Sequence, residues 1–344
     1  MHSIELTSEE IKSIMKIVND LSSKYPSVED EDFLLEASIY AQELPRRLRS
    51  EVNRFRLLET GKGIFLIKGF PINDIELGQT PSHWENKPDK SPTIQQDIYF
   101  YLCSCLLADP IAWATQQEGY VMHDILPVKG YELEQLGAGS EVLLTWHTED
   151  AFHPYRTDYL GLMCLRNPDN VETTYASIDN LELDEATKEK LFERRYVIRP
   201  DESHLEKNRG EIRKEIPVSE EVLRRSYDRI NKLNTSPEKV SILFGDPKNP
   251  YLRLDPYFMD DVLDDIEANN AFNEIVKQVD EKIAGYSIQP GEIIFLDNYK
   301  VVHGRNPFKA RFDGTDRWLK RLNITRDIRK SRDFRISPEN RVIF

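Results

Sequence analysis

Cysteine is scarce in this chain: the three cysteines among 344 residues, Cys103, Cys105 and Cys164, show no disulfide-framework spacing. This excludes a disulfide-stabilised secreted scaffold and indicates a reducing compartment. Cys103 and Cys105 lie in an apolar stretch, so we expect core residues rather than metal ligands. The chain also lacks an apolar run of about 18 residues, the minimum for a membrane span, and residues 1–6 lack the basic and apolar regions of a signal peptide. We therefore expect a cytoplasmic protein.

Basic residues are fewer than acidic residues in this chain. The 46 Lys and Arg residues against 60 Asp and Glu give a formal net charge of −14, which argues against nucleic acid or an anionic membrane as a partner. The balance is compatible with a small cationic substrate and leaves homo-oligomerisation open. Hydrophobic residues make up 39% and charged residues 31%, the ordinary composition of a globular protein with a sizeable core.

The chain is expected to form a single domain, 1–344, that is mainly β with flanking helices. Residues 1–110 form a mostly helical N-terminal part, because a capping box at Thr7–Glu10 and further helices at 30–44 and 93–107 surround a single strand. Residues 111–330 are β-rich, with short apolar runs between turn residues. Candidate strands are 63–70, 119–121, 141–147, 159–166, 174–178, 196–199, 240–244, 251–254, 286–288, 292–297 and 318–325; helices are expected near 184–192 and 261–283, and a loop at 81–92.

The segment of about 201–249 is highly charged, so it cannot bury much apolar surface by itself. We interpret it as an insertion on the β core rather than a separate domain. A lid and a solvated excursion remain alternatives.

His147 and Glu149 stand two residues apart after the apolar run 142–144. On a strand they point to the same side, and an imidazole with a carboxylate supplies two thirds of a 2-His-1-carboxylate site, the arrangement that holds Fe(II) and leaves positions open. His303, which follows the apolar run 293–296, is the candidate third ligand. An isolated H-x-E pair is more often two exposed residues at the end of a strand, so the rest of the pattern decides.

Arg317 and Arg321 stand four positions apart on the strand expected after His303 and therefore share one face. Two guanidinium groups on an inner face are costly without anions, and the fork of arginine matches a carboxylate bidentately. We expect both to bind carboxylates of ligands. The alternative is that both face solvent beside Lys320.

Residues 146–158 and 313–321 resemble the clavaminate synthase-like branch of the Fe(II)/2-oxoglutarate dioxygenases, and within it the hydroxylases of free L-lysine and L-arginine. The similarity extends from about residue 113 to 325. It implies a double-stranded β-helix core (jelly-roll, cupin-like) and dependence on Fe(II), 2-oxoglutarate and O2. The resemblance assigns the iron to His147, Glu149 and His303, and the 2-oxoglutarate carboxylate to Arg317 with help from Thr174.

The resemblance also assigns a substrate site. Arg321 binds the substrate α-carboxylate, Gln116 and Ser140 contact the amino-acid head group, and Glu149 contacts the α-amino group as well as iron. Related halogenases carry Gly or Ala in place of this glutamate, so the retained carboxylate indicates hydroxylation.

The far end of a cationic substrate is assigned to Asp255, which ends the strand 251–254. Arginine hydroxylases of this branch use a second acidic residue two positions after the one that matches Asp255. This chain has Tyr257 at that position. One carboxylate with an aromatic ring suits an ammonium group better than a guanidinium, which rewards two acceptors in its plane. We therefore favour free L-lysine, hydroxylated at C4, with L-arginine 3-hydroxylation as the alternative. Asp255 as a turn residue before Pro256 is the structural alternative.

Two functions of other classes remain open at this point. A zinc hydrolase could use the same three ligands, but it has no use for Arg317. A non-catalytic jelly-roll binding protein could retain the three side chains without turnover.

Overall fold

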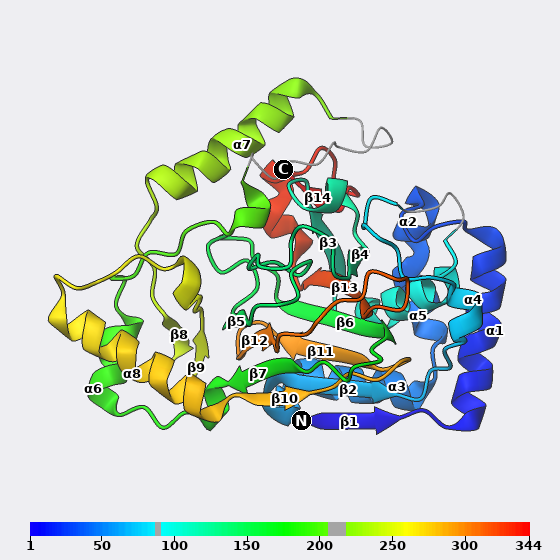
Figure 1. Ribbon diagram of the computed structural model, residues 1–344, viewed down its shortest axis with the longest axis horizontal. Helices are drawn as coiled ribbons and strands as arrows, with labels where there is room; N and C mark the ends of the chain where they lie inside the picture. The colour runs from blue at the N-terminus through cyan, green and yellow to red at the C-terminus, as the bar shows by residue number, and fades with distance from the viewer. Residues whose placement is uncertain (87–90, 206–217) are drawn as a thin grey trace.

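The computed structural model describes residues 1–86, 91–205 and 218–344. Its largest element is an eight-stranded sheet at the centre of the molecule (Figure 1). The strands follow the order β1 (His2–Glu5), β2 (Ile64–Lys68), β11 (Ile293–Asp297), β6 (Tyr159–Arg166), β13 (Trp318–Thr325), β3 (Asp109–Trp113) and β14 (Val342–Ile343), and β4 (His123–Ile125) also pairs with β13. The pairs β1–β2 and β3–β14 are parallel, and the other pairs in this sheet are antiparallel.

A four-stranded antiparallel sheet packs against the large one. Its order is β10 (Ala284–Tyr286), β7 (Thr173–Ser177), β12 (Val301–Arg305) and β5 (Leu144–His147). Apolar side chains from both sheets share one buried cluster, in which Val301 and Tyr175 of the small sheet meet residues of β2, β6, β11 and β13. A separate two-stranded ribbon is formed by β8 (Leu243–Asp246) and β9 (Asn249–Leu252).

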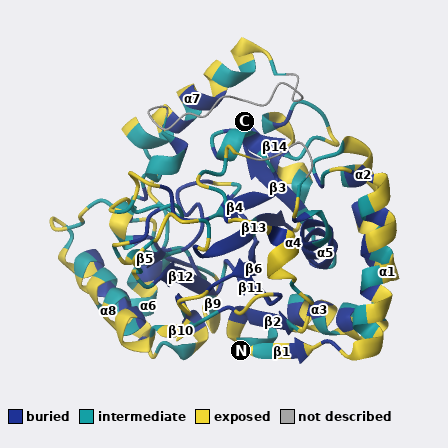
Figure 2. Cartoon of the chain, turned by 45° about the vertical axis from the view of Figure 1, so that its right-hand side comes forward, coloured by how far each residue is buried: buried dark blue, intermediate teal, exposed yellow. Residues whose placement is uncertain are grey.

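Helices cover the outer faces of both sheets, so the central strands are buried while the outer helix faces are exposed (Figure 2). On the large sheet, one apolar cluster joins helices and strands of the N-terminal part. On the small sheet, another cluster joins the helices α6 (Glu185–Phe192) and α8 (Ile266–Lys282) to Val302, Ala176 and Trp146. The helices are α1 (Ser8–Lys24), α2 (Glu31–Tyr40), α3 (Arg46–Leu58), α4 (Asp74–Leu77), α5 (Ile94–Cys105), α6 (Glu185–Phe192), α7 (Glu220–Thr235) and α8 (Ile266–Lys282). None of the helices in the described ranges is long and apolar enough to cross a membrane.

Several local expectations agree with the structure. The Thr7 side chain accepts from the Glu10 amide at 3.2 Å while the Glu10 carboxylate accepts from the Thr7 amide at 2.9 Å, which is the expected capping box. The strands expected at 159–166 and 318–325 have the bounds of β6 and β13. Cys103 is buried in α5.

Other expectations were wrong. The strand expected at 119–121 is a turn, because Glu118 and Gly119 adopt positive φ angles of 54° and 74°. The strand expected at 196–199 forms only isolated bridges. His303 follows the strand expected at 292–297, which is β11, but it lies within a further strand, β12, that was not expected.

Three helices, α3, α4 and α7, had no counterpart in the sequence analysis. Pro45, the residue after the helix expected at 30–44, immediately precedes α3 and provides its N-terminal cap position. The charged segment 201–249 contains α7, which buries Ser226, Tyr227 and Ile230. Residues 206–217 of that segment, and residues 87–90 of the expected loop, lie outside the described residues.

Candidate active site between the two sheets

A cavity of about 440 Å³ opens between the sheets and contains most of the predicted site residues. His147 and His303 are paired across β5 and β12, and their ring centroids lie 4.6 Å apart. Glu149 Oε2 lies 3.6 Å from His147 Nε2 and 3.3 Å from His303 Nε2. Three side chains from distant parts of the sequence therefore converge on one point with ligand atoms of the types that hold Fe(II).

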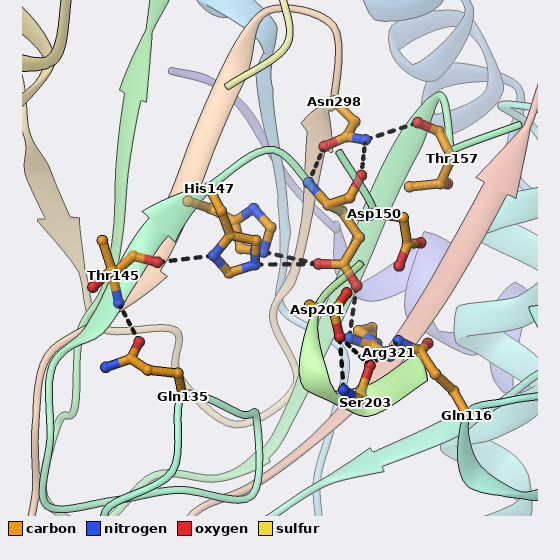
Figure 3. A network of polar contacts seen from close by, with 12 residues as sticks. Gln116, Gln135, Thr145, His147, Asp150, Thr157, Asp201, Ser203, Asn298 and Arg321 are labelled. Carbon is orange, nitrogen blue, oxygen red and sulfur yellow. Dashed lines mark hydrogen bonds and ion pairs between the residues drawn. The ribbon is translucent and has the colours of Figure 1, made fainter. Parts of the chain in front are cut away.

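The hydrogen bonds around His147 fit a metal ligand. Its Nδ1 lies 2.8 Å from the Thr145 carbonyl oxygen (Figure 3). Because that oxygen can only accept, Nδ1 carries a proton and Nε2 is the nitrogen left for the cluster. Burial lowers the pKa of His147, but Glu149 and Asp255 outweigh burial and raise it to about 9. Without a metal Nε2 is therefore also protonated at neutral pH, and a metal ion bound there would displace that proton.

Burial and charge act in opposite directions on the ionisation of Glu149. Burial raises the pKa of this carboxyl, but Arg321, His147 and His303 outweigh burial and hold the pKa well below its ordinary value. Burial lowers the pKa of His303 and outweighs the influence of Glu149. An ionised carboxylate beside a neutral imidazole is the protonation state in which both can bind a cation.

Glu149 is not positioned by strand pairing, because β5 ends at His147. Asn298 holds it instead: the Glu149 amide donates to Asn298 Oδ1 at 2.8 Å, and Asn298 Nδ2 donates to the carbonyl oxygens of Glu149 and Thr157 at 3.0 and 2.8 Å (Figure 3). The Thr148 amide donates to the Leu254 carbonyl at 2.8 Å. The carboxylate thus faces the histidines although the backbone has left the strand.

Arg317 lies at one end of the cavity and is 5% exposed. Burial lowers its pKa to about 10, so the guanidinium stays charged at neutral pH. Its Nη2 donates to Thr173 Oγ1 at 3.3 Å, and among the described residues its buried Nε has no hydrogen-bond partner. A buried cation with an unused donor, beside the three ligands, fits an anionic co-substrate.

The threonine beside Arg317 is Thr173 and not Thr174, which the sequence analysis selected. Thr173 pairs with Arg305 and Thr174 with Gly304 in the ladder of β7 and β12. Because successive residues of a strand point to opposite faces, Thr173 faces the cavity and Thr174 does not line it.

Arg321 connects the cluster to the next part of the cavity. Its Nη1 donates to Glu149 Oε1 at 2.7 Å, and its Nη2 donates to Gln116 Oε1 at 3.0 Å. His123 Nδ1 lies 2.8 Å from the same Nη2. Neither arginine faces solvent beside Lys320, as the alternative required; Lys320 is buried against Asp97 and Asp124.

Asp255 lines the cavity and is buried, and among the described residues no lysine or arginine forms an ion pair with it. Burial, with a smaller contribution from the negative charge of Asp201, raises its pKa to about 7. Asp201 also lines the cavity. The site therefore has two carboxylates that can face a cation, one of them from the charged segment.

Ser140 does not belong to this site. Its side chain is fully buried, it does not line the cavity, and its backbone is bound to Glu132 and Phe308. The structure therefore gives its hydroxyl no access to a substrate head group.

Sequence reasoning missed a second group of polar residues, Asp150, Asp201, Ser203 and His204. Gln116 Nε2 donates to Ser203 Oγ at 2.8 Å, and His204 Nε2 lies 3.0 Å from Asp150 Oδ1. Asp150 is adjacent to Glu149 and could have been found on that ground. Nothing in the sequence distinguishes Asp201, Ser203 and His204 from the charged residues around them.

Comparison with known proteins places these residues in a family. A model of the taurine catabolism dioxygenase TauD, TfdA family matches residues 36–323. An enduracididine beta-hydroxylase of Streptomyces hygroscopicus is 49% identical over the full length of both chains. An L-ornithine/L-arginine 3-hydroxylase of Catenulispora acidiphila is 40% identical, again over the full length of both. An L-lysine 4-hydroxylase of Chitinophaga pinensis is 28% identical over 90% of this chain and 77% of its own.

A solved structure agrees with the sequence relatives. The crystal structure of the non-heme iron oxygenase OrfP in complex with Fe, succinate and (3S)-hydroxy-L-Arg superposes with a TM-score of 0.93 at 38% identity and covers all of both chains. Another OrfP structure contains Fe and α-ketoglutaric acid, the two cofactors expected here. The chain belongs to the TauD/TfdA family, close to the clavaminate synthase-like Fe(II)/2-oxoglutarate dioxygenases that hydroxylate free amino acids.

Proposed function

We propose that this protein hydroxylates C3 of a free L-amino acid with a guanidino side chain, L-arginine in the first instance. The reaction converts the amino acid, 2-oxoglutarate and O2 into the 3-hydroxy amino acid, succinate and CO2. The observation that supports the guanidino group is the pair of carboxylates, Asp201 and Asp255, on one cavity. A guanidinium rewards two acceptors because its donors lie in one plane.

This proposal replaces the sequence-based preference for lysine C4 hydroxylation. That preference assumed a single carboxylate, since Tyr257 stands where a second acid was expected. Asp201 supplies the second carboxylate from another segment. The relatives at 49% and 40% identity are named for enduracididine and for ornithine and arginine, whereas the lysine 4-hydroxylase is 28% identical.

Each cavity residue then has a proposed role. His147, Glu149 and His303 hold the iron, and Arg317 with Thr173 holds the 2-oxoglutarate carboxylate. Bound together, iron and 2-oxoglutarate supply the oxidation of a substrate C–H bond by O2. We interpret the two facing sheets as the double-stranded β-helix of this family, in a single domain that includes the helical N-terminal part and the charged insertion.

The residues of the chain determine which carbon is oxidised. Arg321 and Gln116 receive the substrate head group, and Arg321 is in direct contact with Glu149. The head group therefore binds beside the metal ligands, which places the carbons nearest to it, C3 in particular, close to the metal. Asp201 and Asp255 hold the far end, so that one conformer of a flexible substrate is selected.

A cyclic guanidine is the second candidate substrate, and one observation favours it. Tyr257 lines the cavity mouth with Phe258, with ring centroids 4.9 Å apart, and Tyr257 is 57% exposed. An aromatic ring at this place can stack on a planar cyclic guanidinium. The relative at 49% identity is named for such a substrate.

One competition assay tests the proposal. Equimolar L-arginine, L-lysine and L-ornithine are supplied in one vessel with Fe(II), 2-oxoglutarate and O2, and products are resolved by mass. We expect L-arginine to be consumed first and to give a product whose mass is higher by 16, the mass of one oxygen atom. NMR should place the new hydroxyl group at C3. An enzyme that consumes lysine first refutes the guanidino assignment, and succinate formation independent of every amino acid offered refutes the substrate class.

The cytoplasmic location expected from the cysteine content stays a prediction. A zinc hydrolase at the same ligands is the less economical alternative, because it leaves the buried guanidinium of Arg317 without a purpose.

A further inference from the structure

One short segment, residues 199–205, brings the start of the charged insertion to the wall of the cavity. It contains the 3-10 turn η5 (Glu202–His204). Asp201 caps the N-terminus of this turn, because its side chain accepts from the Ser203 amide at 2.9 Å. His204 follows and is 1% exposed, which is unusual for a histidine in a charged stretch. Its ring packs on Phe152 and Trp113, with centroids 4.9 and 5.7 Å apart.

Both nitrogens of His204 have partners in the cavity wall. Nε2 lies 3.0 Å from Asp150 Oδ1, and Nδ1 lies 2.6 Å from Thr115 Oγ1. These partners come from two different elements, the metal-ligand turn and the end of β3. The imidazole therefore joins the 199–205 segment to both elements at one point.

Asp150 is built to receive this histidine. It has a positive φ of 49°, a conformation that costs free energy for a residue other than glycine. Its carboxylate compensates through two bonds, with Trp113 Nε1 at 2.6 Å on Oδ2 and with His204 on Oδ1. Because Asp150 directly follows Glu149, the anchor lies beside the metal site.

The same residues do not form a second metal site. Ligand atoms of Asp150, Asp201 and His204 lie within 4.8 Å of one another. Both oxygens of Asp150 and both nitrogens of His204 are, however, already in hydrogen bonds with protein groups. The cluster is satisfied by internal contacts, which indicates a structural connection.

Anchoring His204 also fixes two other residues of the same segment, Ser203 and Asp201. Ser203 Oγ accepts from Gln116 Nε2 at 2.8 Å, and Gln116 Oε1 accepts from Arg321. The amide of Gln116 is thereby oriented with its oxygen toward the head-group arginine. Asp201 is held on the cavity wall, which Asp255 also lines, and its negative charge contributes to the raised pKa of Asp255.

We propose that His204 is a positioning residue that fastens the 199–205 segment to Asp150 and Thr115, and so sets both ends of the amino-acid site at once: Gln116 at the head group and Asp201 at the side-chain end. The inference rests on the proposed function for what binds there. It does not involve the metal ligands, because His204 contacts none of the three among the described residues.

The test compares three variants with the wild type. His204→Ala removes both bonds, and His204→Gln retains a donor toward Asp150. His153→Ala is the matched control: His153 is 3% exposed and also packs on Trp113 and Phe152, but within the described part of the chain its side chain forms no hydrogen bond to the 199–205 segment. Thr115→Val, which removes one partner with little change of shape, serves if His204→Ala does not fold.

Amide hydrogen exchange at Ser203, His204 and Leu205 without ligand reads the anchor itself. We expect exchange at least about tenfold faster in His204→Ala, the effect of losing a hydrogen bond of about 1.4 kcal/mol, with near wild-type exchange in His204→Gln and His153→Ala. Unchanged exchange in His204→Ala overturns the anchor. This readout needs no substrate, so it stands even if the wild type does not hydroxylate arginine.

Calorimetry and steady-state kinetics read the consequence for the site. In His204→Ala, KM for L-arginine should rise at least about tenfold with a smaller fall in kcat, while Mn²⁺ and 2-oxoglutarate affinities stay within about twofold. His204→Gln should restore most of the KM. A parallel loss of Mn²⁺ affinity overturns the proposal, because it would place the effect at the metal turn. A lower melting temperature with unchanged KM also overturns it.

Discussion

Arg321 donates a 2.7 Å hydrogen bond from Nη1 to Oε1 of Glu149, while Oε2 of the same carboxylate faces His147 and His303. One carboxylate thus connects the proposed metal ligands to the arginine that we propose receives the substrate head group. Through this contact, Glu149 and Arg321 set the distance between metal and substrate. Glu149 is held by Asn298, and Arg321 by Gln116.

Replacing Glu149 tests both connections. Glu149→Gln keeps the shape but removes the charge, and it leaves the half-buried guanidinium of Arg321 without its anion. We expect Mn²⁺ affinity and turnover to fall by at least about 100-fold, since even partners of metal ligands contribute about 10- to 100-fold. Titration calorimetry measures the Mn²⁺ affinity. Asp255→Asn is the control and should keep Mn²⁺ affinity; equal loss in both variants contradicts the assignment.

Metal binding should stabilise the fold. A metal ion that binds only the folded chain contributes about 2.7 kcal/mol at about 100 times its Kd. We therefore expect Mn²⁺ to raise the melting temperature of the wild type, measured by differential scanning calorimetry in chelator-treated buffer. His147→Ala and His303→Ala should show no such increase. A similar increase in either variant would mean that the ion binds elsewhere.

The co-substrate site can be tested with neighbouring threonines. Arg317→Gln should raise KM for 2-oxoglutarate about 100-fold, because hydrogen bonds to charged groups contribute about 1.5–3 kcal/mol each. Thr173→Val should raise it by a smaller factor, and Thr174→Val should leave it unchanged, since Thr173 alone of the pair contacts Arg317. Equal effects of the two valine substitutions would contradict the strand register.

Asp255 predicts a pH dependence of substrate binding. Burial raises its pKa to about 7, so the carboxyl is mostly neutral at pH 6 and mostly ionised at pH 8. Affinity for a guanidinium should therefore increase as pH rises through 7, by up to about tenfold per pH unit below the pKa. Binding of L-arginine to enzyme saturated with Mn²⁺ and 2-oxoglutarate measures this. Asp255→Asn should bind weakly at every pH, and a retained slope in that variant assigns the titration to another group.

The cluster was predictable because its residues stand beside strongly patterned strands. His147 follows an apolar run, His303 lies after β11, and Arg321 lies in β13, whose bounds were expected correctly. Residue type and spacing were sufficient to bring the chemistry together. It was harder to predict which face of a strand a residue occupies. Thr173 and Thr174 are chemically alike, and a shift of one residue moves a side chain to the other face of the strand.

The side-chain end of the substrate site was not predictable in the same way. Asp201 and His204 belong to a charged segment without periodicity, and tertiary contacts with Asp150 and Gln116 alone bring them to the cavity. The lysine preference is less well supported than its arginine alternative for this reason. It counted the acids near Asp255 in the sequence, whereas the second carboxylate comes from an element that is distant in the sequence.

Isotope labelling under ¹⁸O₂ tests the central claim most directly. With Fe(II), 2-oxoglutarate and L-arginine, the account predicts a hydroxylated product and a succinate that each carry one ¹⁸O atom, and no product when 2-oxoglutarate is omitted. A product whose new oxygen comes entirely from water, or turnover of arginine without 2-oxoglutarate, would contradict the account.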